Sequence, residues 1–178
     1  MDHRSEDVPL PPAGPIAGWL SADHARLDGF LAQATAADPI GPGPYAEFRR
    51  GLLRHVAIEE KILLPAAQRA RGGDPLALAA RLRLDHGAIA ALLVPTPTPA
   101  IVATLRHILT AHNALEEEPG GLYAVCDDLL AGDADAIVGK MASYPDVPMS
   151  PHNDGPGVMA ALRRALERAG YRLRDDAW

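Results

Sequence analysis

Histidines stand in four apolar stretches of this 178-residue chain, at positions 24, 55, 86 and 112. A glutamate follows two of them by four residues, in His55-Val-Ala-Ile-Glu59 and His112-Asn-Ala-Leu-Glu116. Residues four apart lie on the same face of an α-helix, so each pair would present an imidazole beside a carboxylate. Imidazole nitrogens and carboxylate oxygens are both ligands for metal cations. The spacing therefore points to metal chemistry.

The elements that must position these side chains are helices. Each histidine belongs to a stripe of aliphatic residues with i, i+3 and i+4 spacing, which predicts amphipathic helices. Prolines and glycines mark their ends, giving expected helices at 16–37, 44–71, 75–94 and 99–118. Pro65 should kink the second helix or end its α-geometry early. Shorter helices are expected at 122–131, 134–142 and 158–170, and no alternating pattern typical of strands is present.

This order of elements predicts an all-α fold, an up-down-up-down four-helix bundle with a C-terminal helical extension. We expect a flexible N-terminal arm at 1–15, the bundle at 16–118 and the extension at 119–178. Intervals of 31, 31 and 26 residues separate successive histidines of the four stripes. In antiparallel helices with short connections, such even spacing returns each imidazole to about the same level of the core.

Gathering two carboxylates and four imidazoles in an apolar core is costly without a cation, since unpaired buried polar atoms cost about 1–3 kcal/mol each. A single buried histidine is more often an ordinary core residue, but four matched stripes favour a metal. Two carboxylates able to bridge suit two cations rather than one. Donors without thiolate favour iron, with manganese or zinc as alternatives. The predicted ligands are His24, His55, Glu59, His86, His112 and Glu116, with Glu59 and Glu116 as bridges.

Composition excludes several other classes of function. The formal net charge is −6 with no basic stripe, which argues against a nucleic-acid partner. No run of about 18 apolar residues exists, so we expect no membrane span, and no leader pattern is recognised at the N-terminus. The single cysteine, Cys126, excludes an internal disulfide framework and favours a cytoplasmic location.

The motifs resemble those of hemerythrin-like (HHE cation-binding) domains. The resemblance rests on ADHARLDGFL around His24, LLRHVAIEEKILLP around His55, LRLDHGAIAALL around His86 and LRHILTAHNALEEE around His112, and it covers about residues 16–118. It implies a non-haem di-iron centre with an oxo or hydroxo bridge and two bridging carboxylates. Residues 119–178 are outside the resemblance.

Two departures from oxygen-carrying hemerythrins bear on function. Those proteins have a further histidine one turn before the third-helix ligand, where this chain has Leu82, and an aspartate five residues after the fourth-helix histidine, where Glu116 stands at four. An open coordination position favours reaction with oxygen, nitric oxide or peroxide over reversible oxygen carriage. If the chain is an enzyme, we expect a di-iron oxidoreductase that decomposes peroxide. The alternative is a non-enzymatic iron-binding module for sensing, storage or repair, and a homodimer stays open.

We expect lesser roles for the other polar residues near these motifs. Asp28, one turn after His24, is the best spare carboxylate for accepting a ring N–H. Asp85 should face solvent, and Glu60 should be a surface charge or salt-bridge partner. Tyr123 follows a glycine hinge and could fold over the end of the bundle as an additional ligand or a radical trap. An ordinary role is favoured for it. His107 should face away from the core, since five residues turn a helix by about 140° from His112.

Overall fold

The computed structural model describes residues 13–174, and within this range the chain is helical without strands. The N-terminal arm expected at 1–15 falls almost wholly outside the described residues. The main helices are α1 (Pro15–Ala34), α2 (Pro42–Ile58), α3 (Leu64–Ala70), α4 (Ala79–Leu92), α5 (Pro99–Glu117), α6 (Leu122–Leu129), α7 (Ala134–Ala142) and α8 (Pro156–Ala169). The all-α prediction is therefore confirmed for the described residues, and the helix ends lie close to those expected.

Local sequence explains these ends. Proline stands at the start of α1, α2, α5 and α8, where its missing N–H needs no partner. Thr98 caps α5 by accepting a hydrogen bond from the backbone N–H of Ile101 at 3.2 Å. Gly170 ends α8 with a φ of 83°, a left-handed conformation that favours glycine.

The second predicted helix is interrupted by one wide turn. A π-helical segment covers Glu59–Leu63 between α2 and α3, and the backbone N–H of Leu64 bonds to the carbonyl of Glu59. Pro65 has no N–H to continue the α-helical ladder, which accounts for the widened turn just before it. The expected early end of α-geometry is confirmed, and Glu59 is the first residue of the wide turn.

Two apolar clusters divide the core. One contains Leu20, Ile58 and Leu82, and the other contains Leu27, Leu52 and Ile89. On α1 and α4 the chain runs from the first cluster to the second, and on α2 and α5 it runs back. Each of the four histidines falls between the two clusters on its own helix, so the expected common level is confirmed.

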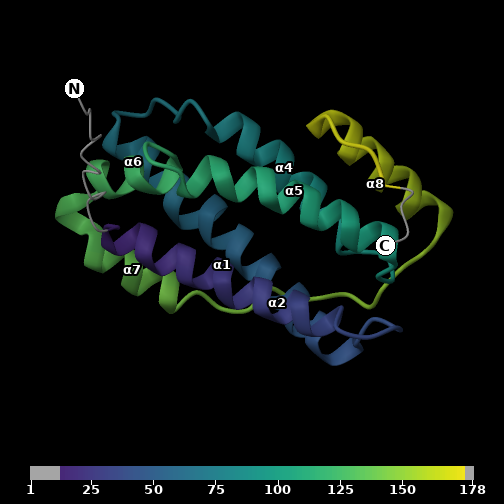
Figure 1. The fold of residues 1–178 in the computed structure, drawn as a ribbon. Coiled ribbons are helices and arrows are strands. Elements are labelled where there is room, and N and C mark those ends of the chain that lie inside the picture. The colour runs from purple at the N-terminus through teal and green to yellow at the C-terminus, as the bar shows by residue number, and fades with distance from the viewer. Residues whose placement is uncertain (1–12, 175–178) are drawn as a thin grey trace, which may run out of the picture.

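The C-terminal helices pack on this core rather than standing apart. α6 contacts α1 and α5, α7 contacts α1, and α8 lies along α4 (Figure 1). Arg54 of α2 donates to the backbone carbonyls of Met141, Ala142 and Tyr144, at the end of α7. Among residues 13–174, no helix has the length and apolar character needed to cross a membrane.

Candidate metal centre

The six side chains singled out by spacing meet between the two apolar clusters. His55, Glu59, His86, His112 and Glu116 are at most 3% exposed and His24 is 8% exposed. Ligand-type atoms lie within 4.8 Å of one another in two groups, one formed by His24, His55 and Glu59, the other by Glu59, His86, His112 and Glu116. The structure thus brings all six predicted residues together, and Glu59 belongs to both groups.

Each glutamate divides its two oxygens between two pairs of rings. Glu59 Oε1 lies 3.3 Å from His55 Nε2, while its Oε2 lies 3.0 Å from His86 Nε2. Glu116 Oε1 lies 3.1 Å from His112 Nε2, while its Oε2 lies 3.6 Å from His24 Nε2. The cluster therefore has two halves, the His24/His55 half and the His86/His112 half, with both carboxylates spanning them.

A different carboxylate faces the other nitrogen of every ring. Nδ1 of His24 lies 2.5 Å from Glu117, Nδ1 of His55 2.9 Å from Asp23, Nδ1 of His86 2.7 Å from Glu60, and Nδ1 of His112 3.5 Å from Asp85. A carboxylate that accepts from Nδ1–H fixes the ring orientation and leaves the lone pair of a neutral ring on Nε2. This hydrogen bond directs the Nε2 atoms of His24, His55 and His86 inward as metal-ligand atoms. His112 Nδ1 faces Asp85 without a hydrogen bond, and its Nε2 faces Glu116.

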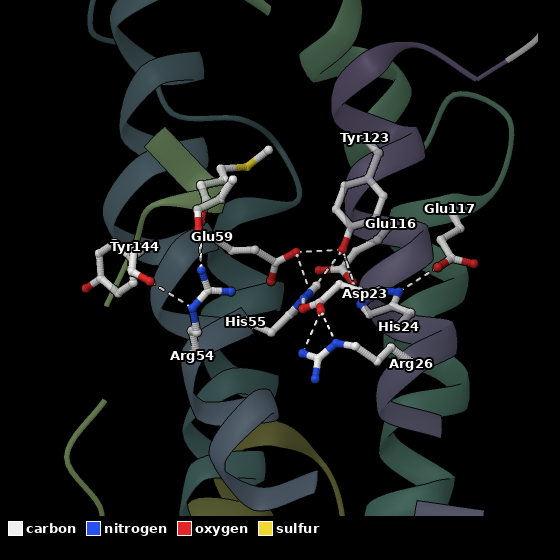
Figure 2. A network of polar contacts seen from close by, with 12 residues as sticks. Asp23, His24, Arg26, Arg54, His55, Glu59, Glu116, Glu117, Tyr123 and Tyr144 are labelled. Atoms are coloured by element: carbon white, nitrogen blue, oxygen red, sulfur yellow. Dashed lines mark hydrogen bonds and ion pairs between the residues drawn. The ribbon is translucent and has the colours of Figure 1, made fainter. Parts of the chain in front are cut away.

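Arginines hold three of these four outer carboxylates from behind. Arg26 donates to Asp23 at 2.7 and 2.9 Å, as Figure 2 shows. Arg81 lies 3.0 Å from Asp85, and Arg83 lies 3.2 Å from Glu60. The carboxylates that orient His55 and His86 are thus each bound by an arginine as well as by the ring, and Asp85, which faces His112, is also paired with an arginine.

Tyr123 of α6 reaches into the His24/His55 half. Its side chain is 1% exposed, and its hydroxyl points into the space between Glu59, Glu116 and His24 (Figure 2). The hydroxyl lies 2.6 Å from Glu59 Oε1, 3.1 Å from Glu116 Oε2, 3.2 Å from His24 Nε2 and 3.4 Å from His55 Nε2. From the sequence, Tyr123 is only a less favoured candidate for a ligand, because the direction in which the chain leaves the preceding turn cannot be deduced.

Three inward-facing atoms of the His86/His112 half have no hydrogen-bond partner among residues 13–174. They are Glu59 Oε2, His86 Nε2 and Glu116 Oε1, all of them buried. Glu59 Oε2 and His86 Nε2 are 3.0 Å apart, yet their geometry is not that of a hydrogen bond. Leaving buried polar atoms unsatisfied is costly, whereas a cation between such donors would satisfy them together.

Without a cation, protons balance the buried charges. Burial opposes a charge on the His55 ring, but Glu59 and Asp23 raise its pKa to about 10. Burial likewise opposes a charge on His112, whose pKa Asp85 and Glu116 raise to about 9. The pKa of His24 is lowered by burial and by the neighbouring His55 ring. Burial and the charge of Glu59 raise the pKa of Glu116.

A cavity of about 240 Å³ reaches the cluster at His24. Apolar side chains of α1 and α2 form part of its wall, including Leu27 and Phe48, while Arg106 and Asn113 come from α5. This size and lining suit a small molecule rather than a cofactor-sized ligand.

Some predictions for the surrounding residues are confirmed and others are wrong. The prediction for Asp85 was wrong: it is fully buried, because α8 covers α4 and Arg81 of α4 donates to the carbonyl of Ala169. Asp28 is exposed and makes no hydrogen bond or ion pair with a ring, whereas Asp23, which the spacing does not single out, orients His55. Glu60 forms a salt bridge with Arg83, which is one of the two roles expected for it. His107 is exposed, as expected.

Comparisons with other proteins add no relative to this picture. No family model matches the chain, and neither a curated protein nor a solved structure does.

Proposed function

We propose that this chain is a hemerythrin-like four-helix bundle that holds two iron cations between α1, α2, α4 and α5, and that a small molecule, oxygen, nitric oxide or peroxide, binds or reacts there. The His24/His55 half would hold one cation and the His86/His112 half the other. Glu59 and Glu116 would bridge them through separate oxygens.

One observation carries this proposal: four Nε2 atoms face two shared carboxylates, and a different acid lies beside Nδ1 of each ring. An ordinary buried histidine is satisfied by one hydrogen-bond partner on each nitrogen. That need does not explain why four rings turn their Nε2 atoms toward the same two carboxylates. The donor set of nitrogen and oxygen without sulfur favours iron over softer metals.

The residues of the chain would divide the work. Iron, when bound, supplies redox chemistry and polarises a small ligand. Glu59 and Glu116 keep the two positions together when the charge of the site changes. Asp23, Glu60, Asp85 and Glu117 hold the rings in one orientation, and the apolar clusters above and below exclude bulk water.

The near-complete burial of the cluster supports a second candidate, a non-enzymatic module for iron sensing, storage or repair. Stopped-flow mixing of the ferrous protein with excess peroxide distinguishes the two. Many rapid turnovers indicate a peroxide-decomposing oxidoreductase, whereas a single stoichiometric oxidation indicates the module.

The metal content tests both candidates at once. Metal-free protein titrated anaerobically with ferrous iron should take up about two equivalents. Uptake that is absent, or unchanged in Glu59→Gln, would contradict the proposed centre, because Glu59 contributes to both halves.

A further inference from the structure

We propose that Tyr123 is a fifth protein ligand on the His24/His55 half, where its phenolate binds the cation directly. This inference rests on the proposed function. It concerns a buried phenol that lies against the cluster and outside the set of four histidines and two glutamates.

The position of the phenol oxygen is that of a ligand. Its distances to the four donor atoms of this half run from 2.6 to 3.4 Å. Neighbouring donors around an octahedral cation with bonds of about 2.1 Å are about 3.0 Å apart. The spacing of Tyr123 from His24, His55 and the two carboxylates is therefore close to that of donors sharing one cation.

Hydrogen bonding and cation binding place different demands on these contacts. A phenol donates one O–H, and its oxygen can accept from a ring N–H; in the metal-free protein its closest acceptor is Glu59 Oε1 at 2.6 Å. The single O–H cannot be given fully to both Glu59 Oε1 and Glu116 Oε2, which lies 3.1 Å away. A single cation at this place would engage all five atoms.

Local structure holds Tyr123 in place. The turn after α5 has Gly120 at a φ of 80°, and α6 starts at Leu122 directly after Gly121. Asp127, one turn further along α6, accepts hydrogen bonds from the backbone N–H groups of Ile16 at 2.9 Å and Ala17 at 3.0 Å. These free N–H groups at the start of α1 bind a carboxylate well, so α6 is fastened to α1 just beyond the phenol.

The two halves then differ in kind. On the His24/His55 half, the phenol completes a set of two nitrogens and three oxygens. On the His86/His112 half, the described ligand-type atoms are two nitrogens and two carboxylate oxygens, and Leu82 stands one turn before His86. The described residues therefore offer the His86/His112 half one donor fewer than the His24/His55 half.

The chemistry is a simple exchange. The O–H bond of Tyr123 breaks, a bond from the phenolate oxygen to the cation forms, and the proton passes to the solvent. No electron is transferred, so no oxidant or reductant is needed.

Ferric iron is the probe, because phenolate bound to ferric iron gives a charge-transfer band in the visible region. Protein loaded with iron and oxidised in air should show this band, and excitation into it should enhance tyrosine ring vibrations that shift with ring-deuterated tyrosine. Tyr123→Phe should lose the band while Tyr144→Phe, a tyrosine of the loop after α7, retains it.

A second variant covers the case in which Tyr123→Phe does not fold or bind iron. The chain has four tyrosines, so Tyr45→Phe/Tyr144→Phe/Tyr171→Phe leaves only Tyr123 and should retain the band. Loss of the band in this variant, or its survival in Tyr123→Phe, would overturn the assignment. Wild-type protein with two irons and no phenolate band would overturn this inference alone, whereas failure to bind iron would overturn it together with the proposed function.

Discussion

At the scale of single residues, the arrangement around each ring is repeated four times with different partners. An inward Nε2 and an outward Nδ1 facing an acid recur at His24, His55, His86 and His112. In metal sites, the partner on the second nitrogen raises the basicity of the ring and fixes its direction. The outer acids should therefore affect affinity although they are not ligands.

Asp23 offers the clearest test of that effect. Asp23→Asn removes the charge that faces His55 and Arg26, and should weaken iron binding about 10- to 100-fold. Asp28→Asn is the matched control, because Asp28 lies one turn of α1 away from His24, is exposed and makes no hydrogen bond or ion pair with a ring. Competition with a coloured chelator measures both. Equal affinities in the two variants would refute a role for the outer acids.

The buried rings also predict how stability varies with pH. The pKa values of His55 and His112 rise on folding from 6.5 to about 10 and about 9, so protonation of these rings stabilises the folded metal-free protein. That contribution is complete below pH 6.5 and is lost as the pH rises through 9 to 10.

Urea unfolding of the metal-free protein should therefore show a falling free energy of unfolding between pH 7 and pH 10. The iron-loaded protein should not show this loss, because its rings are already neutral and bound. A metal-free protein whose stability is constant or rising across this range would contradict the assignment of charge to the two rings.

What the sequence could predict at this scale follows from helical periodicity. The inward residues were found because a 3.6-residue period fixes which side chains share a face. The outer acids were not, since their role depends on a neighbouring helix: Glu60 of the π turn reaches His86 of α4, and Asp85 is buried by α8.

At the scale of elements, the turn between α5 and α6 decides where Tyr123 lies. A Cβ on Gly121 would stand 2.8 Å from the backbone carbonyl oxygens of Leu115, Glu116 and Glu118. Only glycine fits there without moving the backbone of α5 next to Glu116. The sequence shows the glycines, but the direction in which the chain leaves them depends on this close packing.

Gly121→Ala should accordingly displace α6, destabilise the protein by roughly 1–3 kcal/mol and reduce the phenolate band. Gly139→Ala in α7 is the control, because a Cβ there meets nothing within 4 Å and alanine should stabilise that helix by about 0.5–1 kcal/mol. Thermal unfolding and the visible spectrum measure both effects. A Gly121→Ala variant with wild-type stability and spectrum would show that the turn is not constrained.

At the scale of the whole molecule, the helices after residue 118 complete the core. α6 supplies Tyr123, α7 is joined to α2 through Arg54, and α8 buries Leu162 and Leu166 against the cluster that contains Ile89. Residues 119–178 were predicted as an extension of short helices without an assigned contact to the site. Their contribution comes from packing between segments far apart in sequence, which periodicity cannot reveal.

Metal and fold should be linked in this arrangement, since the unfolded chain has no preformed set of donors. At a free iron concentration of about 1,000 times Kd, binding adds about 4 kcal/mol, so chelation should lower Tm by roughly 8–16 °C. Calorimetry with and without chelator checks this, and Glu59→Gln should show little difference between the two conditions. An unchanged Tm in the wild type would separate metal binding from folding.

The most direct measurement of the central claim is anomalous X-ray scattering at the iron edge from crystals of the iron-loaded protein. We predict two anomalous peaks, one among His24, His55 and Glu59 and one among Glu59, His86, His112 and Glu116. A single peak, no peak at the cluster, or iron bound elsewhere on the chain would contradict the account.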